Sequence, residues 1–68
     1  MNEEDFNLSV RKFLKSFGVQ AQHEIEQAVA DALKRGAISG SETLPGKITL
    51  EFPGLKLDVE FNGEIVLG

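Results

Sequence analysis

Histidine is the side chain whose unperturbed pKa lies closest to neutrality, and this chain has one, His23. A catalytic general base needs a partner group and a pocket, but the neighbours of His23, among them Glu24 and Glu26, supply no nucleophile. We therefore interpret His23 as a solvated residue on the polar side of a helix. A single histidine without any cysteine also argues against the common zinc sites, which need several such ligands.

The carboxylates are numerous, but their positions have a structural explanation. They fall at the expected starts of helices and on the polar side of the expected strands: Glu3, Glu4, Asp5, Glu24 and Glu26, then Glu51, Asp58 and Glu60. Paired acids for hydrolysis must flank a cleft, and a chain of 68 residues has little room for one. No glycine-rich phosphate loop is present, because Gly36, Gly40 and Gly46 lack the required spacing. The sequence predicts no enzyme, no cofactor, no metal and no small-molecule substrate.

The one concentration of positive charge consists of Arg11, Lys12 and Lys15. Cations at the end of a helix favour the negative end of its dipole, and a solvated helix end is our first interpretation of this cluster. The alternative is contact with an acidic partner or a phosphate backbone. The formal net charge of -4 argues against sequence-independent attraction to nucleic acid or to anionic lipid.

Two helices are expected to carry these residues. Asn2 suits a helix N-cap, and a stripe at helical spacing predicts a first helix over about residues 3–17, with Gly18 as a left-handed stop. A second stripe predicts a second helix over about residues 20–35, with Gly36 as its stop; no strong N-cap precedes it, so its start stays open by a few residues. The two stripes are Phe6, Val10, Phe13, Leu14 and Phe17, then Ala21, Ile25, Ala28, Val29, Ala32 and Leu33.

A loop and three strands are expected after the helices. Residues 37–46 hold two glycines, two serines, a threonine and a proline, which predicts a loop of about ten residues and the most mobile part of the chain. Alternation of apolar and polar residues then predicts strands over about 47–52, 55–61 and 64–67. The middle strand alternates throughout: Leu55, Leu57, Val59 and Phe61 against Lys56, Asp58 and Glu60.

The first turn of the sheet is expected at Phe52-Pro-Gly-Leu55, as a four-residue loop, because L-Pro-Gly fits a tight hairpin poorly. The expected register sets Phe52 opposite Leu55, Leu50 opposite Leu57 and Ile48 opposite Val59, and on the other face Glu51 opposite Lys56 and Lys47 opposite Glu60.

The second turn is expected at Asn62-Gly63 and has two readings. A two-residue turn places Val66 on the apolar face, whereas a bulged loop with Gly63 in the left-handed conformation places Ile65 there. Burying the aliphatic residues of the bulged register gains a few kcal/mol, and the exposed pair of glutamates that it creates costs less than about 1 kcal/mol. We predict that Ile65 faces inward and Val66 outward, and the face of Ile65 tests this choice.

The predicted fold class is α+β in one domain, residues 1–68, with two N-terminal helices packed on one face of a C-terminal three-stranded antiparallel meander. A cysteine-free chain this small must gain its stability from packing alone, and a second copy is a common way to bury more surface. The expected core is Phe6, Val10, Phe13, Phe17, Ile25, Val29, Leu33, Ile48, Leu50, Leu57, Val59 and Ile65.

For function, the first hypothesis is a non-catalytic protein-interaction module whose partner is an unknown protein or a second copy. The short edge strands lack a protecting proline or an inward-pointing charge, and Val66 is the expected contact there. The alternative is a nucleic-acid-binding domain of shortened winged-helix type, using the basic end of the first helix together with the second. The acidic residues Glu24 and Glu26 of the second helix would repel phosphate and argue against this alternative.

The location is expected to be cytoplasmic. The first residues are acidic and lack the basic and apolar regions of a signal peptide. No apolar run approaches the roughly 20 residues that span a bilayer.

The opening Met1-Asn-Glu-Glu-Asp-Phe-Asn7, the run Arg11-Lys-Phe-Leu-Lys15 and the Gly63-Glu-Ile65 near the end resemble a family of very small uncharacterised bacterial proteins. The resemblance covers nearly the whole chain, and most of its residues are core and cap positions. It implies a shared fold and a bacterial cytoplasmic origin, and it implies no activity, substrate or site.

Overall fold

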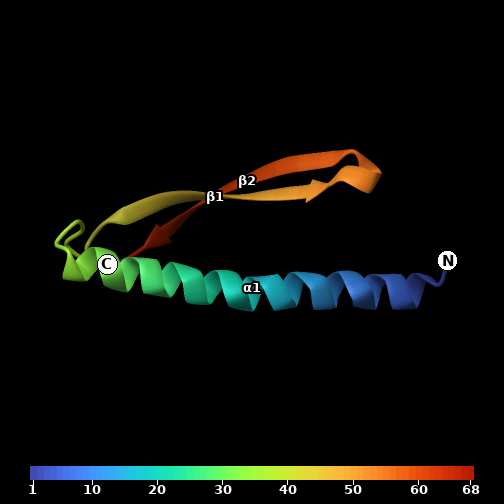
Figure 1. Ribbon diagram of the computed structural model, residues 1–68, viewed down its shortest axis with the longest axis horizontal. Helices are drawn as coiled ribbons and strands as arrows, with labels where there is room; N and C mark the ends of the chain where they lie inside the picture. Colours follow the sequence, from blue (N-terminus) through green and yellow to red (C-terminus); the bar gives the residue numbers. More distant parts are fainter. The chain divides into compact units, whose positions relative to one another are not determined.

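The computed structural model describes residues 1–68 and shows one helix followed by a β-hairpin (Figure 1). The elements are α1 (Glu3–Lys34), β1 (Thr43–Phe52), the 3₁₀ turn η1 (Pro53–Leu55) and β2 (Leu57–Val66). They form two units, Met1–Arg35 and Gly36–Gly68. The predicted α+β class is confirmed, but the predicted arrangement is wrong, because one helix replaces two and two strands replace three.

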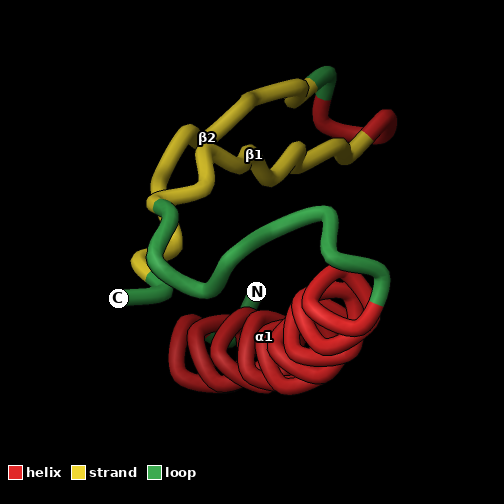
Figure 2. The backbone as a smooth tube through the Cα atoms, turned by 90° about the vertical axis from the view of Figure 1, so that its left-hand side faces the viewer, coloured by secondary structure: helices red, strands yellow, loops and turns green.

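The helix α1 continues through Gly18 without a break (Figure 2). A glycine ends a helix by adopting a left-handed conformation, and Gly18 is not among the residues with positive φ. A glycine inside a helix costs only about 1 kcal/mol relative to alanine, a cost that a helix of 32 residues tolerates. The predicted division into helices over 3–17 and 20–35 is therefore wrong.

Both outer ends of the predicted helical region are confirmed. At the start, the Asn2 side-chain oxygen accepts a hydrogen bond of 3.1 Å from the backbone N–H of Asp5. At the end, the N–H of Arg35 donates to the carbonyl of Asp31 at 3.0 Å, and Gly36 follows in the left-handed conformation with φ +69°. The predicted N-cap at Asn2 and the predicted stop at Gly36 are therefore both correct.

The first predicted turn of the sheet is in the right place, but the register differs by two residues. The connection spans Pro53 to Lys56, and Lys56 takes a left-handed conformation with φ 53°. A shift of two keeps every side chain on its predicted face. The observed pairs on the apolar face are Phe52 opposite Leu57, Leu50 opposite Val59 and Ile48 opposite Phe61.

The second predicted turn is absent, because β2 runs straight through Asn62 and Gly63 to Val66. Its last residues pair with Thr43–Gly46, which the sequence pattern had assigned to a loop. The prediction that Ile65 shares the face of Val59 and that Val66 points to the other face is correct. The arrangement results from a continuous strand and not from the predicted bulged turn. Pro45 is tolerated because each strand of a two-stranded sheet has an edge without a pairing partner.

The predicted core is not observed, because no residue of the chain is buried. Exposure of the residues expected in the core reaches 65% at Ile48. A single helix and a two-stranded ribbon each present an apolar face, but neither element encloses an interior of its own.

Candidate functional site

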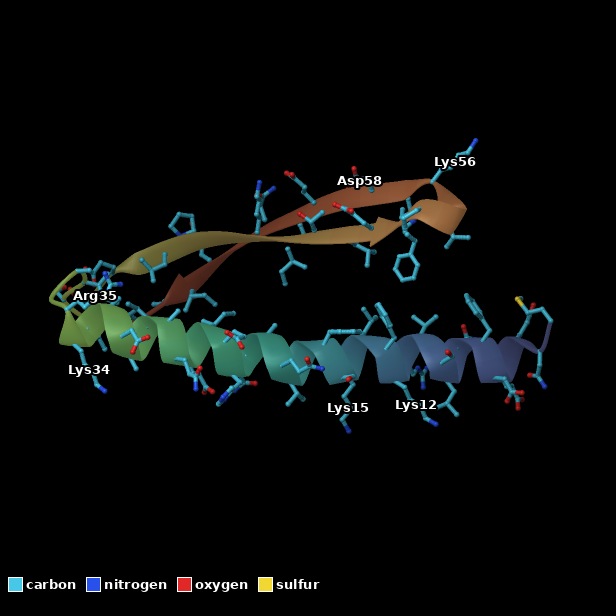
Figure 3. All side chains as sticks on the ribbon, in the orientation of Figure 1. Lys12, Lys15, Lys34, Arg35, Lys56 and Asp58 are labelled. Atoms are coloured by element: carbon cyan, nitrogen blue, oxygen red, sulfur yellow. The ribbon has the colours of Figure 1, made fainter.

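The basic cluster lies inside the first half of α1 and not at a helix end. Lys12 and Lys15 project from the same side of the helix (Figure 3), and neither they nor Arg11 takes part in an ion pair, since the one salt bridge of the chain joins Lys47 to Glu60. The dipole acts over the last turn of a helix, and the basic residue of that turn is Lys34. The dipole interpretation of the cluster is therefore wrong.

The winged-helix alternative loses its structural basis because α1 is one continuous helix. A helix-turn-helix reader needs a turn between the first helix and the recognition helix, and α1 has no turn at Gly18.

The continuity of α1 joins the two predicted stripes into one, which we call the α1 stripe. It consists of Phe6, Val10, Phe13, Phe17, Ala21, Ile25, Ala28 and Ala32, and the other members of the predicted stripes, Leu14, Val29 and Leu33, flank it. Its large side chains are exposed, from 40% at Val10 to 53% at Phe17. The rings of Phe13 and Phe17 meet edge to face with 4.8 Å between their centroids, so this pair is ordered within the helix itself.

The hairpin has one apolar face and one face whose charged residues, apart from Lys47, are acidic. On the charged face Lys47 Nζ lies 3.5 Å from Glu60 Oε1, a predicted pair that forms diagonally because Glu60 lies directly opposite Thr49. Glu51 lies opposite Asp58 and not opposite Lys56, which is in the turn (Figure 3). Like charges directly across a ladder are destabilising. Val66 is 68% exposed on this face, and its role as a contact stays a prediction.

The loop before β1 is organised by Glu42, a residue that the sequence interpretation did not single out. Its carboxylate accepts hydrogen bonds from the backbone N–H groups of Ser39 at 2.8 Å, Gly40 at 2.9 Å and Ser41 at 3.1 Å. These bonds, the one from Ser39 first, lower the pKa of Glu42 from 4.5 to about 2, against an opposing contribution from desolvation. The Ser-x-x-Glu spacing from Ser39 to Glu42 resembles a capping box and could have identified this arrangement.

The same loop is tied to the end of the hairpin. The N–H of Leu67 donates to the carbonyl of Glu42 at 2.9 Å, and a Cβ placed on Gly68 would lie 3.0 Å from the carbonyl oxygen of Gly40. The predicted loop over 37–46 is thus shorter than expected, since β1 begins at Thr43.

The residues that could do chemistry are not brought together. His23 is exposed on α1, and no group of three or more His, Cys, Asp and Glu side chains could hold a metal ion. An open depression on α1 is lined by Asp5, Leu8, Ser9 and Lys12. All four come from the first turns of a single helix, so the depression has no opposing wall.

A membrane span would require a helix that is both long and apolar, and α1 does not combine the two. The structure therefore defines a small α+β chain, a long amphipathic helix joined to a β-hairpin. This chain belongs to DUF6494, a family of unknown function, whose model matches residues 1–68, and the resemblance to an uncharacterised family of small proteins is confirmed. Neither the curated proteins nor the solved structures contain a match.

Proposed function

We propose that this chain is a non-catalytic protein-interaction module whose apolar faces are covered by another protein chain. The observation that carries the proposal is that no residue is buried while sixteen large apolar side chains are exposed. Monomeric soluble proteins rarely leave extended apolar surface in water, and surface of this kind marks a site of association.

The two units support the proposal separately. In proteins most helical stability comes from packing of the apolar face and not from helix propensity alone. A two-stranded hairpin is marginally stable without something packed on its apolar face. Both α1 and the hairpin carry such a face, in the α1 stripe and in the row that includes Leu50, Val59 and Phe61.

Amide hydrogen exchange of the purified chain over a dilution series tests the proposal. Protection of the α1 amides is expected to depend on another protein molecule: it either falls on dilution or stays low at every concentration of the chain alone. Full protection of α1 that persists unchanged at the highest dilution would overturn the proposal, since the faces would then be covered without any other molecule.

The module is proposed to act in the cytoplasm, the location that the sequence interpretation favours. Fractionation of the source cells followed by immunodetection tests this location, and recovery from the periplasm or the medium would contradict it.

A further inference from the structure

The spacing of the α1 stripe is the same in both directions along the helix. Successive stripe residues from Phe6 to Ala32 are separated by four, three, four, four, four, three and four positions, so the pattern is symmetric about Val19. Two antiparallel copies centred at that level would therefore set every stripe residue opposite another. The opposed pairs would be Phe6 with Ala32, Val10 with Ala28, Phe13 with Ile25 and Phe17 with Ala21.

The sizes of the side chains are complementary under the same operation. The half of the stripe before Val19 holds three phenylalanines, whereas the half after it holds three alanines and Ile25. Antiparallel pairing sets a larger side chain against alanine in three of the four opposed pairs, which is how facing layers interdigitate at native density. Parallel pairing in register would set Phe6, Phe13 and Phe17 against themselves and leave alanine against alanine at the other end.

The charges along α1 follow the same order. The first turn holds Glu3, Glu4 and Asp5 and the last turn holds Lys34. In antiparallel copies centred at Val19, the acidic first turn of one copy would lie beside Lys34 of the other. Lys12 of one copy would lie at the level of Glu26 of the other. Parallel copies would set like charges at the same level. Exposed pairs of this kind contribute little energy, but they select orientation.

The large side chains of the α1 stripe are accessible to a second copy, since Phe6, Val10, Phe13, Phe17 and Ile25 are 40–53% exposed. The stripe itself spans about 39 Å of helix.

We propose that the α1 stripe binds the α1 stripe of a second copy of this chain in antiparallel orientation, with the twofold axis at the level of Val19. This inference rests on the proposed function and names its partner. The mean stripe spacing of about 3.7 residues exceeds the 3.6 of a straight helix, so the two helices wind around each other with a right-handed sense.

Single-cysteine variants test the orientation directly, because the natural chain has no cysteine. The variants Val10→Cys and Ala28→Cys are each treated with a short thiol-specific cross-linker, alone and mixed. In the proposed dimer the two copies of position 10 lie about 27 Å apart, so each variant alone gives no cross-linked dimer and the mixture does. Efficient cross-linking of each variant alone, as parallel helices would give, overturns the proposal.

A matched pair of variants tests the stripe. Phe17 and Val19 are neighbours that are 53% and 63% exposed, and they point to opposite sides of α1 because two residues turn the helix by about 200°. Sedimentation equilibrium of the natural chain is expected to give twice its mass of 7.4 kDa. Phe17→Asp should raise the dissociation constant at least about 100-fold, whereas Val19→Asp should change it less than about threefold.

The outcomes separate this inference from the proposed function. A monomer with rapidly exchanging α1 amides overturns the second copy as the partner and leaves the interaction module standing, since the stripe would then await a different protein. A monomer with α1 protected at every dilution overturns both. A dimer in which Val19→Asp weakens association as much as Phe17→Asp does overturns the stripe as the contact surface.

Discussion

Replacement of Gly18 by alanine should stabilise the protein, and this sign tests the continuity of α1. Gly18 lies near the middle of a helix that runs from Glu3 to Lys34, with no positive φ. A Cβ added there meets no atom within 4 Å. The full difference in helix propensity between glycine and alanine, about 0.8–1.0 kcal/mol, should therefore appear as added stability.

Gly36→Ala is the matched control, because the sequence interpretation assigned both glycines the same role as a helix stop. A Cβ at Gly36 also meets nothing within 4 Å, but φ is +69°. A side chain in this left-handed conformation costs about 1–2 kcal/mol. The two substitutions are chemically identical, and the structure predicts effects of opposite sign.

Thermal unfolding followed by far-ultraviolet circular dichroism, at one chain concentration, measures both effects. For a domain of this size, 1 kcal/mol corresponds to a shift in Tm of about 4–8 °C. Gly18→Ala should raise Tm by about that amount, and Gly36→Ala should lower it by at least as much. A fall in Tm for Gly18→Ala would refute the continuous helix, because it would mean that Gly18 adopts a conformation or a close approach that a methyl group cannot enter.

Three further predictions concern single side chains. Asn2→Ala should lower the free energy of unfolding by about 1 kcal/mol through loss of the cap on Asp5, and chemical denaturation that shows no change would contradict this. Asp58→Lys should raise the stability by about 0.2–1 kcal/mol, because it replaces a like charge opposite Glu51; lower stability in the same assay would count against the register. The lowered pKa of Glu42 means that its contribution is present above pH 4.5 and is lost as the pH falls toward about 2. The protection of the amides that it binds, taken relative to intrinsic exchange at each pH, should fall over that interval, and Glu42→Gln should abolish this pH dependence.

The two glycines show why part of the fold could be predicted from the sequence. After Gly36 only Ala37 and Ile38 precede a run of turn-forming residues, Ser39-Gly-Ser41, so the sequence does not favour a helical continuation. Gly18 is followed by Val19 and then by residues that continue a helical pattern. Glycine only permits a left-handed conformation. Whether a helix stops there depends on the residues that follow, and at Gly18 the helical continuation prevails.

The Asn62-Gly63 turn failed for a related reason, which is that a local signal competes with pairing at longer range. Asn-Gly favours a tight turn when the two flanking segments can pair with each other. Here the segment after Gly63 has an alternative partner in Thr43–Gly46, which the presence of Pro45 had concealed. The faces were nevertheless predicted correctly, because the alternation of apolar and polar residues fixes the parity of a strand whatever its register.

The candidate interaction surface was missed for the same reason as the helix was divided. Each half of the α1 stripe, taken separately, is an ordinary amphipathic helix, one bulky and one rich in alanine. When Gly18 lies inside one helix, the two halves form a single stripe that is centred at Val19. The large side chains of one half can then pack against the small side chains of the other half in a second copy. Since a second copy is the simplest partner that supplies the missing complement to both halves at once, the continuity of α1 and the identity of its partner are linked. A break at Gly18 would remove the physical basis for both.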